Sequence, residues 1–494
     1  MKLRRLWIDH FKNLRNCEVT FEQPYLLNAV IGGNGSGKSN LVEAILHILL
    51  DTYLNKSPPF DFSLEYEAQG RRVGLSAAEG RLRAIVDEQE MPIRHFTRRL
   101  RDGEAQVFYP ESTFAYYSGE CDRIRRLIKR YLASFRQLVQ EPERDNLRPL
   151  FVLSTNQQAR HILLGLVAHR QVDFLRRLKI SGARDIKIVL QSPKGFDSEK
   201  DEPVLWGTTG KVRKTIAALA ETADHEESRR AIKHGDGEES TLGGAFTETR
   251  TYSYPDNFRS TKPESGLKHR LEAGRDNLYL ALEHLAARGI LQGVEYQLIG
   301  DERGEPFDFE QLSEGEKQLI AVVGAIRLTN QRDNLVLLDE PDTHLNPQWS
   351  WEYPEMLEEA FDVSQREHST VLMATHDPVT ISGLVAPQVF LANASGKEQS
   401  VFEHPRRNPR GQGVANLLCS SEFFGLPSSL DKKTQVLMDE RLDLSVKMTL
   451  TQADKQRLRE LNEMLEILQP GISERDPNYV EFLRSRREAT GGAS

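Results

Sequence analysis

Short apolar runs that lead into polar or glycine-rich turns recur along this chain. The segment "NAVIGGNGSGKSNLVEAILHILL", residues 28–50, predicts a strand, a glycine-rich loop and an apolar helix. Residues 335–338 and 371–374 are continuous apolar runs, the pattern of strands buried on both faces of a parallel sheet. Such strands combined with helices indicate an α/β fold.

Other patterns occupy the start, the middle and the end of the chain. "RRLWIDHFKNLRNCEVTF" predicts two strands joined at Phe11-Lys12-Asn13. Near the end, Thr451 with Asp454 three residues on predicts the start of a helix with an apolar leucine face, which stops at Pro470-Gly471. In the middle we predict helices at 121–139, 156–180 and 275–290, strands at 185–193 and 202–212, and a loose hairpin or mobile loop at 222–266.

Composition and charge limit the possible classes of protein. The 494 residues include 65 Lys and Arg against 73 Asp and Glu, a net charge of −8, so there is no global basic field for nucleic acid. Cys17, Cys121 and Cys419 are far apart and lack metal-ligand spacing, which argues against a disulfide framework and fits a reducing cytoplasm. We expect no signal peptide and no membrane span, and therefore a cytoplasmic protein.

The glycine-rich loop carries the strongest motif. Gly32, Gly37, Lys38 and Ser39 fit G-x-x-x-x-G-K-[ST], in which backbone N–H groups and the lysine hold phosphates while the serine hydroxyl ligates magnesium. Glycine-rich turns also occur without ligands, but the strand before and the helix after favour a phosphate loop. The expected ATP-binding residues are Asn34, Gly35, Ser36, Gly37, Lys38, Ser39 and Asn40.

Polar residues follow the two apolar runs. In "NLVLLDEP", Asp339 is placed to hold Mg²⁺, and Glu340 to orient and deprotonate an attacking water. The alternative is an acidic pair that only starts a turn. In "STVLMATHDPV", His376 is expected to contact the γ-phosphate and Glu340, although a lone histidine at a strand end is often only a satisfied polar group.

A second anion site is indicated by "QLSEGEKQLIAVVGAI", residues 311–326. Ser313 is a good helix N-cap, and a helix N-terminus attracts an anion. Because the phosphates of the same chain already lie at the helix that begins near Asn40, this site is spare in a monomer. Two chains arranged head-to-tail about a two-fold axis would use both sites twice.

These segments together resemble the ABC-type ATPases, in the soluble branch with the SMC and OLD-like proteins. The resemblance implies an ABC-type ATPase head with a mixed sheet flanked by helices, and a homodimer with shared ATP sites. It implies that "LSEGE" is the signature motif, usually LSGGQ, that Asp342 belongs to the D-loop, and that Lys12 lies by the nucleotide. The signature residues that contact the γ-phosphate of the partner copy are then Ser313, Glu314, Gly315 and Glu316.

Two features depart from the family pattern. Glu314 replaces the first signature glycine and Glu316 the glutamine, which we interpret as slow or regulated hydrolysis. The Q-loop glutamine is not placed, with Gln106 and the segment "FAYYSGE", residues 114–120, as candidates.

The remaining chain suggests a division into four parts. We predict the two halves of the ATPase head at 1–118 and 301–425, an inserted, mostly helical lid with a small β portion at 119–300, and a helical partner-docking region at 426–494. No D-x-D of an OLD-type nuclease domain occurs after His376. "SERDPNYVEFLRSRRE", "FAYYSGE" and the compact lid resemble the PtuA ATPases of Septu and retron antiphage systems. That resemblance implies a separate HNH nuclease partner, PtuB-like, and assembly of dimers into a higher oligomer.

A different reading is an ATP-dependent DNA-binding clamp of the SMC/RecF kind, acting in repair or recombination. It depends on the basic clusters at 94–101, 123–130 and 406–410, which are otherwise ordinary solvated faces. A transporter motor is disfavoured because there is no signal for a membrane partner and the lid is too large. The function of a neighbouring gene would discriminate between a nuclease-linked switch and a repair clamp.

Overall fold

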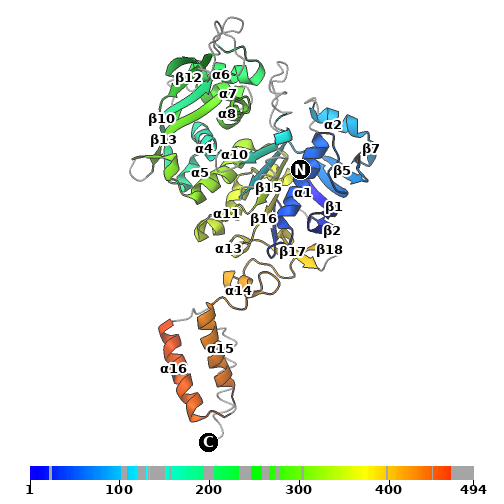
Figure 1. The fold of residues 1–494 in the computed structure, drawn as a ribbon, viewed down its shortest axis with the longest axis vertical. Helices are drawn as coiled ribbons and strands as arrows, with labels where there is room; N and C mark the ends of the chain where they lie inside the picture. Colours follow the sequence, from blue (N-terminus) through cyan, green and yellow to red (C-terminus); the bar gives the residue numbers. More distant parts are fainter. Residues whose placement is uncertain are drawn as a thin grey trace, which may run out of the picture. The chain divides into compact units, whose positions relative to one another are not determined.

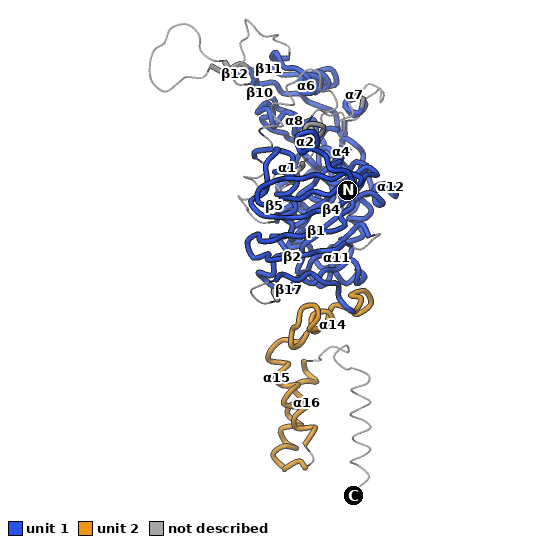
Figure 2. Tube along the Cα trace, turned by 90° about the vertical axis from the view of Figure 1, so that its right-hand side faces the viewer, with its two compact units in different colours: residues 1–406 blue, residues 407–494 orange. Residues whose placement is uncertain are grey.

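The chain forms two compact units, residues 1–406 and 407–494 (Figure 2). The structure is a computed structural model that describes residues 1–21, 25–101, 108–118, 129–131, 133, 151–154, 158–193, 205–232, 246–258, 266–273, 277–301, 305–395, 399–447 and 449–468. The four-part division at 118, 300 and 425 stays a prediction.

A thirteen-stranded sheet forms the centre of the first unit, in the order β7-β6-β5-β4-β1-β2-β18-β17-β3-β16-β15-β8-β9. Its parallel part is built from β3, β16, β15, β8 and β9, and every residue of β3, β15 and β16 is buried. The bounds of these strands are Leu27–Ile31, Thr370–Ala374, Asn334–Asp339, Ser112–Tyr117 and Phe151–Ser154. The predicted α/β class, with a mixed sheet flanked by helices, is therefore confirmed.

Most of the other strand pairs of this sheet are antiparallel, while β17 pairs parallel with β3 and β18 parallel with β2. β1 (Lys2–Phe11) pairs with β2 (Leu14–Thr20) through a tight turn at Lys12 and Asn13, which confirms the predicted pair of N-terminal strands. β17 (Val389–Ser395) runs parallel to β3 and pairs antiparallel with β18 (Gln399–Glu403), which lies next to β2. The outer strands are β4 Phe62–Ala68, β5 Arg71–Ala78, β6 Arg81–Val86 and β7 Gln89–Met91.

Helices flank the parallel strands. The predicted apolar helix is α1 (Lys38–Tyr53), which contacts β15 and β16 and buries most of its length (Figure 1). A longer helical segment from Glu314 to Thr329 consists of α9 (Glu314–Leu319), the π-helical turn Ile320–Gly324 and α10 (Ala325–Thr329); we call it the signature helix. The remaining helices of this part are α2 Ile93–Arg101, α11 Pro347–Glu359, α12 Val363–His368 and α13 Pro378–Ile381.

The region between β9 and the signature helix contains more β structure than the sequence predicted. A five-stranded antiparallel sheet has the order β11-β12-β10-β13-β14. Its strands are β11 His225–Ile232, β12 Phe246–Tyr254, β10 Ile180–Gln191, β13 Leu291–Gly300 and β14 Pro306–Asp308. Its helices are α4 Ala159–Ala168, α5 Val172–Arg177, α6 Gly210–Thr222, α7 Leu267–Ala273 and α8 Leu278–Ala287. The β11–β12 pairing confirms the predicted hairpin.

One predicted element in this region is wrong. Residues 205–207 form a turn and Gly210 starts α6, where we predicted a strand over 202–212. Trp206, Gly207 and Gly210 have φ values of 51°, 63° and 60°, a left-handed conformation that an extended strand cannot contain. The predicted helix at 121–139 lies almost entirely outside the described residues.

The inserted region packs directly on the signature helix. A Cβ at Gly324 would lie 2.9 Å from Leu166 Cδ1, and a Cβ at Gly165 would lie 2.9 Å from Leu328 Cδ1. Glycine on each of the two helices therefore permits their close approach.

The second unit contains α14 (Val414–Cys419), α15 (Lys432–Val446) and α16 (Gln452–Leu468), with α15 and α16 packed on each other. The predicted N-terminus of α16 is confirmed, since Thr451 and Asp454 exchange hydrogen bonds of 2.9 and 3.2 Å between side chains and backbone N–H groups. Of the predicted leucine face, Leu461 and Leu465 are buried and Leu468 is exposed. Among the described helices, none is long and apolar enough to cross a lipid bilayer.

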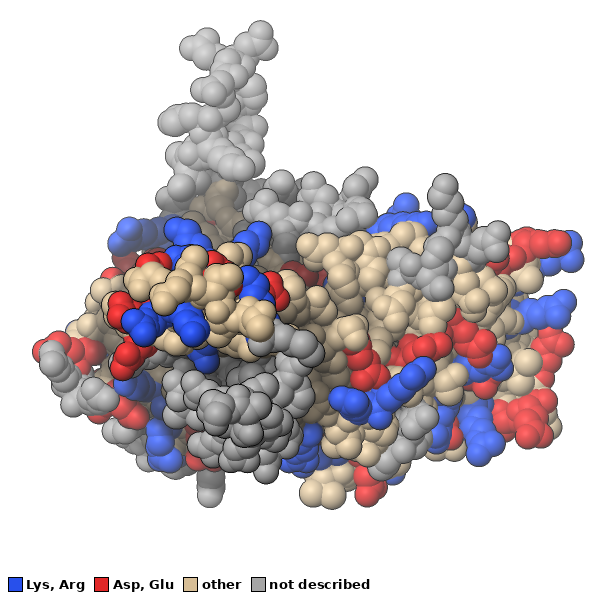
Figure 3. All heavy atoms as spheres, turned by 90° about the horizontal axis from the view of Figure 1, so that it is seen from below, with Lys and Arg blue, Asp and Glu red and all other residues tan. Residues whose placement is uncertain are grey.

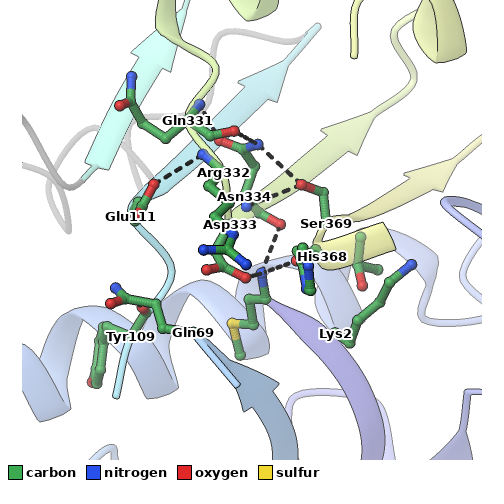
Figure 4. A network of polar contacts seen from close by, with 12 residues as sticks. Lys2, Gln69, Tyr109, Glu111, Gln331, Arg332, Asp333, Asn334, His368 and Ser369 are labelled. Carbon is green, nitrogen blue, oxygen red and sulfur yellow. Dashed lines mark hydrogen bonds and ion pairs between the residues drawn. The ribbon is translucent and has the colours of Figure 1, made fainter. Parts of the chain in front are cut away.

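A polar network fixes the amino end of β15 (Figure 4). The backbone N and the side chain of Asn334 both donate to Ser369 Oγ, at 3.1 and 3.0 Å, and Asn334 Oδ1 accepts from Gln331 N at 2.8 Å. Arg332 N donates to Glu111 Oε2 at 2.9 Å. These bonds tie β15 to the segments that precede β16 and β8, and so hold the carboxyl ends of the three strands in register.

Candidate functional site

The phosphate loop joins β3 to α1. Its glycines Gly32, Gly35 and Gly37 have φ values of 152°, 78° and 104°, which L-residues rarely adopt. A Cβ at Gly32 would lie 2.4 Å from the carbonyl oxygen of Ala392. Lys38 Nζ donates to the carbonyl oxygens of Gly32 and Gly33 at 2.8 and 3.3 Å. The lysine ammonium thus lies over the loop that would surround a phosphate.

The turn between β1 and β2 supports this loop. Asn13 donates from its side chain to the carbonyl oxygen of Gly35, and Asn40 donates to Asn13 Oδ1. Lys12, which the resemblance places by the nucleotide, has a φ of 57° and forms an ion pair with Glu43 of α1. Sequence reasoning selected the lysine and missed Asn13, the neighbouring residue that contacts the loop.

Asp339 ends β15 beside the loop. Its carboxylate accepts hydrogen bonds from Ser39 and from Tyr117 at the end of β8. Burial raises the pKa of Asp339 to about 6, Glu340 acts in the same direction, and the bonds from Ser39 and Tyr117 act against it. Asp339 Oδ1 is buried and has no hydrogen-bond partner among the described residues. A buried carboxylate oxygen without a partner is costly unless a cation completes it.

These residues fit a nucleotide with a bound divalent cation. The hydroxyl of Ser39 and the unpartnered oxygen of Asp339 are hard oxygen ligands of the kind Mg²⁺ prefers. Burial lowers the pKa of Lys38, while the carboxylates of Glu340 and Asp339 act to raise it. The lysine therefore lies within the electrostatic field of both strand-end carboxylates.

Glu340 and His376 meet at the ends of β15 and β16. His376 Nδ1 lies 3.3 Å from Glu340 Oε1, and the two side chains are 53 and 36% exposed. Glu340 has a φ of 49°, and its backbone N–H donates to the carbonyl oxygen of Ala374 at 2.8 Å. A carboxylate that is open to water and aligned by an imidazole is suited to general-base chemistry.

Asp342 lies on the turn after β15. Thr375 Oγ1 donates to Asp342 Oδ2 at 2.6 Å, and Asp377 N donates to Thr375 Oγ1 at 3.0 Å. Burial raises the pKa of Asp342, and the Thr375 bond acts against that shift. The turn is in this way attached to the segment that carries His376.

The signature segment, residues 312–316, begins the signature helix. Ser313 is the N-cap: Glu316 N donates to Ser313 Oγ at 3.3 Å, and Ser313 N donates to Glu316 Oε2 at 2.7 Å. Glu316 therefore completes a capping box, which gives a local reason for glutamate at this position. Glu314 is exposed and pairs with Lys317 at 3.2 Å, and a Cβ at Gly315 would lie 2.6 Å from His344 O.

The structure brings together the predicted residues of three strand ends. Lys38 and Ser39 follow β3, Asp339 and Glu340 end β15, and His376 follows β16. The segment 114–120 contributes Tyr117 to Asp339, whereas Gln106 lies outside the described residues. Tyr117 was missed as a site residue; its register opposite Asp339 on the next parallel strand is a signal only the sheet order reveals.

Comparisons with known proteins agree with this chemistry. A family model described as "AAA ATPase domain" matches residues 1–109, and one described as "AAA domain, putative AbiEii toxin, Type IV TA system" matches residues 202–382. The chain is 26% identical to Septu protein PtuA of Bacillus mycoides over 163 residues, which are 32% of this chain and 22% of the relative.

Two further relatives come from other systems. Retron Vc95 probable ATPase of Vibrio cholerae is 28% identical over 135 residues, 25% of each chain. DNA replication and repair protein RecF of a Synechococcus strain is 33% identical over 114 residues, 23% of this chain and 28% of the relative. The matched segments thus span between 22 and 28% of these relatives' length.

The chain belongs to the AAA/ABC-type ATPase class that contains the SMC, RecF and OLD proteins. PtuA and a retron ATPase are among its homologues.

Proposed function

We propose that this protein is an ATP-binding and ATP-hydrolysing dimeric switch that holds and regulates a partner HNH nuclease in bacterial antiphage defence. The observation that carries the ATPase part is the convergence of Lys38, Asp339 and Glu340 at adjacent strand ends. The similarity to Septu protein PtuA supports the defence context and the nuclease partner.

ATP would be held by the backbone N–H groups of residues 34–40 and by Lys38, whose ammonium would exchange the Gly32 carbonyl for phosphate oxygens. Ser39 and Asp339 would hold Mg²⁺, which neutralises charge on the phosphates when bound. Lys12 would add positive charge at the side of the loop. The unpartnered Oδ1 of Asp339 supports this assignment.

Glu340 would orient a water against the γ-phosphate and take its proton. His376, at 3.3 Å from Glu340, would fix the carboxylate and contact the phosphate. The strained backbone of Glu340 supports a functional role, because a non-glycine residue with positive φ is kept only where the surroundings hold it.

The second half of the site would come from another copy. Ser313, Glu314, Gly315 and Glu316 would face the γ-phosphate bound by the partner, with Asp342 at the interface between the copies. The exposed carboxylate of Glu314 would oppose the phosphate charge and slow closure. Hydrolysis would therefore be slow or regulated, and the dimers would build a higher oligomer.

The nuclease would dock on the second unit, within residues 426–494. There α15 and α16 expose apolar side chains to water, and a partner protein that covered them would bury this apolar surface. These side chains are Val436, Leu442, Val446, Met464, Ile467 and Leu468.

The experiment is co-purification of the tagged protein with the product of its adjacent gene, followed by DNA cleavage with and without Mg-ATP. A stoichiometric complex whose cleavage responds to ATP is the expected result, and Lys38→Ala should remove the response without removing the nuclease. Ile467→Glu on α16 should weaken the complex while ATP binding stays unchanged. Recovery of the ATPase alone, without a nuclease, would contradict the proposal.

The second candidate is an ATP-dependent DNA clamp, which the 33% identity to RecF favours. Of the basic clusters, Arg94, Arg130, Arg406, Arg407 and Arg410 are described and exposed. Figure 3 shows basic and acidic side chains intermixed on the face that it draws, rather than a large area of one sign. Steeply salt-dependent duplex binding by the ATPase alone would favour this candidate over the first.

A further inference from the structure

The buried side chain of Gln318 joins the signature helix to the turn that carries Glu340. Gln318 is fully buried, and its Oε1 accepts a hydrogen bond from His344 N at 3.1 Å. Its Nε2 donates to the carbonyl oxygen of Glu340 at 3.4 Å. Both bonds go to the backbone of a single turn, residues 340–344, and the Gln318 side chain also forms a hydrogen bond with Tyr116 of β8.

The same face of the helix makes a second contact with this turn. Gly315 lies one helical turn before Gln318, and residues three apart share a helix face. A Cβ at Gly315 would lie 2.6 Å from the carbonyl oxygen of His344, so the helix and the turn touch through backbone atoms. A displacement of the signature helix must therefore move the turn, or break the two Gln318 bonds.

The turn is also held from its other side. Glu340 N donates to Ala374 O at 2.8 Å, and Thr375 Oγ1 donates to Asp342 at 2.6 Å. Glu340 keeps a φ of 49° between these two attachments. Its carboxylate thus takes its direction from β16 on one side and from the signature helix on the other.

We propose that Gln318 is a positioning residue that couples the signature segment to Glu340 within one chain. Contact between Ser313 and the nucleotide of a second copy then sets the orientation of Glu340 in the chain that makes the contact. This inference rests on the proposed function, and it adds a route by which the two ATP sites of a dimer influence each other's hydrolysis.

The experiment compares ATP turnover of the full-length wild type, Gln318→Met and Gln318→Glu in Mg-ATP titrations. Methionine fills the same space and removes both hydrogen bonds to the turn together with the one to Tyr116. Glutamate keeps an acceptor for His344 N but, when ionised, places a carboxylate oxygen against the carbonyl oxygen of Glu340. Gln348→Met is the control, since Gln348 is an exposed residue of α11 whose side chain donates a hydrogen bond to Glu352 on the same helix, away from the 340–344 turn.

We expect Gln318→Met to bind ATP within about twofold of wild type and to lose roughly 10- to 100-fold in kcat, because small misplacements of a catalytic group cost that much. Its Hill coefficient should fall to 1 from a wild-type value above 1. Gln318→Glu should lose at least as much kcat as Gln318→Met, because its buried carboxylate would face the Glu340 carbonyl oxygen without a donor, and Gln348→Met should match wild type.

Each alternative outcome has a definite meaning. Wild-type kcat and Hill coefficient in both Gln318 variants would overturn the coupling, as would a wild type that hydrolyses ATP with a Hill coefficient of 1. If Gln318→Met does not fold, Gln318→Glu decides by the same criteria. A folded wild type that neither binds nor hydrolyses ATP would instead refute the proposed function itself.

Discussion

Replacing Asp339 by asparagine should change how the stability of the nucleotide-free protein depends on pH. Asp339 is 3% exposed, and burial raises its pKa from 3.8 to about 6. The folded state therefore holds a proton that the unfolded chain has already released between these pH values. A raised carboxyl pKa means that stability falls as pH rises. The free energy of unfolding of the wild type should therefore decrease between about pH 4 and 6 and keep this lower value at higher pH.

The magnitude follows from the pKa difference. At about 1.4 kcal/mol per pKa unit, a pKa near 6 against 3.8 makes the ionised, buried carboxylate about 3 kcal/mol unfavourable at neutral pH. Asparagine has a similar shape and does not titrate. The free energy of unfolding of Asp339→Asn minus that of wild type should thus rise by about 2 to 3 kcal/mol from pH 4 to pH 7.5.

Urea unfolding in EDTA, without nucleotide, measures this difference at several pH values. Tryptophan fluorescence is a suitable probe, because Trp7, Trp206, Trp349 and Trp351 all lie in residues 1–406. Glu340→Gln is the matched comparison: the buried Asp339 carboxylate remains, so a fall in stability with rising pH should persist, while loss of the Glu340 charge, which also raises the pKa of Asp339, should make it smaller. Parallel curves for wild type and Asp339→Asn across this range would refute the reasoning. Mg-ATP should stabilise the wild type and not Asp339→Asn.

Other substitutions test single contacts of the site. Lys38→Ala should lose ATP binding at least tenfold in a direct binding assay, and equal binding would remove the phosphate-loop assignment. Glu340→Gln should bind ATP normally, fall at least about 100-fold in turnover and accumulate as an ATP-bound dimer in size-exclusion chromatography; unchanged turnover would show that another group is the base. Gly32→Ala should destabilise the protein by roughly 1 to 3 kcal/mol in thermal unfolding, since its Cβ would lie 2.4 Å from Ala392 O; an unchanged melting temperature would contradict the close approach. Ser313→Ala should lower the free energy of unfolding by about 1 kcal/mol through loss of the N-cap, and should reduce ATP turnover with little effect on ATP binding. Unchanged or faster turnover would count against a contact between Ser313 and a phosphate.

The sequence was most informative where chemistry and local structure coincide. Glycines at 32, 35 and 37 predict a loop with positive φ, and the apolar runs before Asp339 and Thr375 predict buried strands. A capping box is equally local, and Thr451 was found in this way. By contrast, the chain from 202 to 212 has apolar residues typical of a strand, yet left-handed residues at 206, 207 and 210 turn it into a helix start.

Contacts between distant segments could not be predicted in the same way. Asn13 reaches the phosphate loop because β1 and β2 pair with Phe11 opposite Leu14, which places their turn beside α1. Tyr117 reaches Asp339 because β8 and β15 are adjacent and parallel in this particular register. Neither residue belongs to a motif with a fixed spacing from the residue it contacts.

The ATPase class and the residue types of the site could be predicted from short motifs, because a phosphate loop, strand-end carboxylates and a capped helix depend on short-range chemistry. Which of these groups contact one another depends on the fold. Gln318 became a link between Ser313 and Glu340 only through the packing of the signature helix on the 340–344 turn. Long-range packing depends on the order and register of strands far apart in the chain, and no local pattern encodes that order.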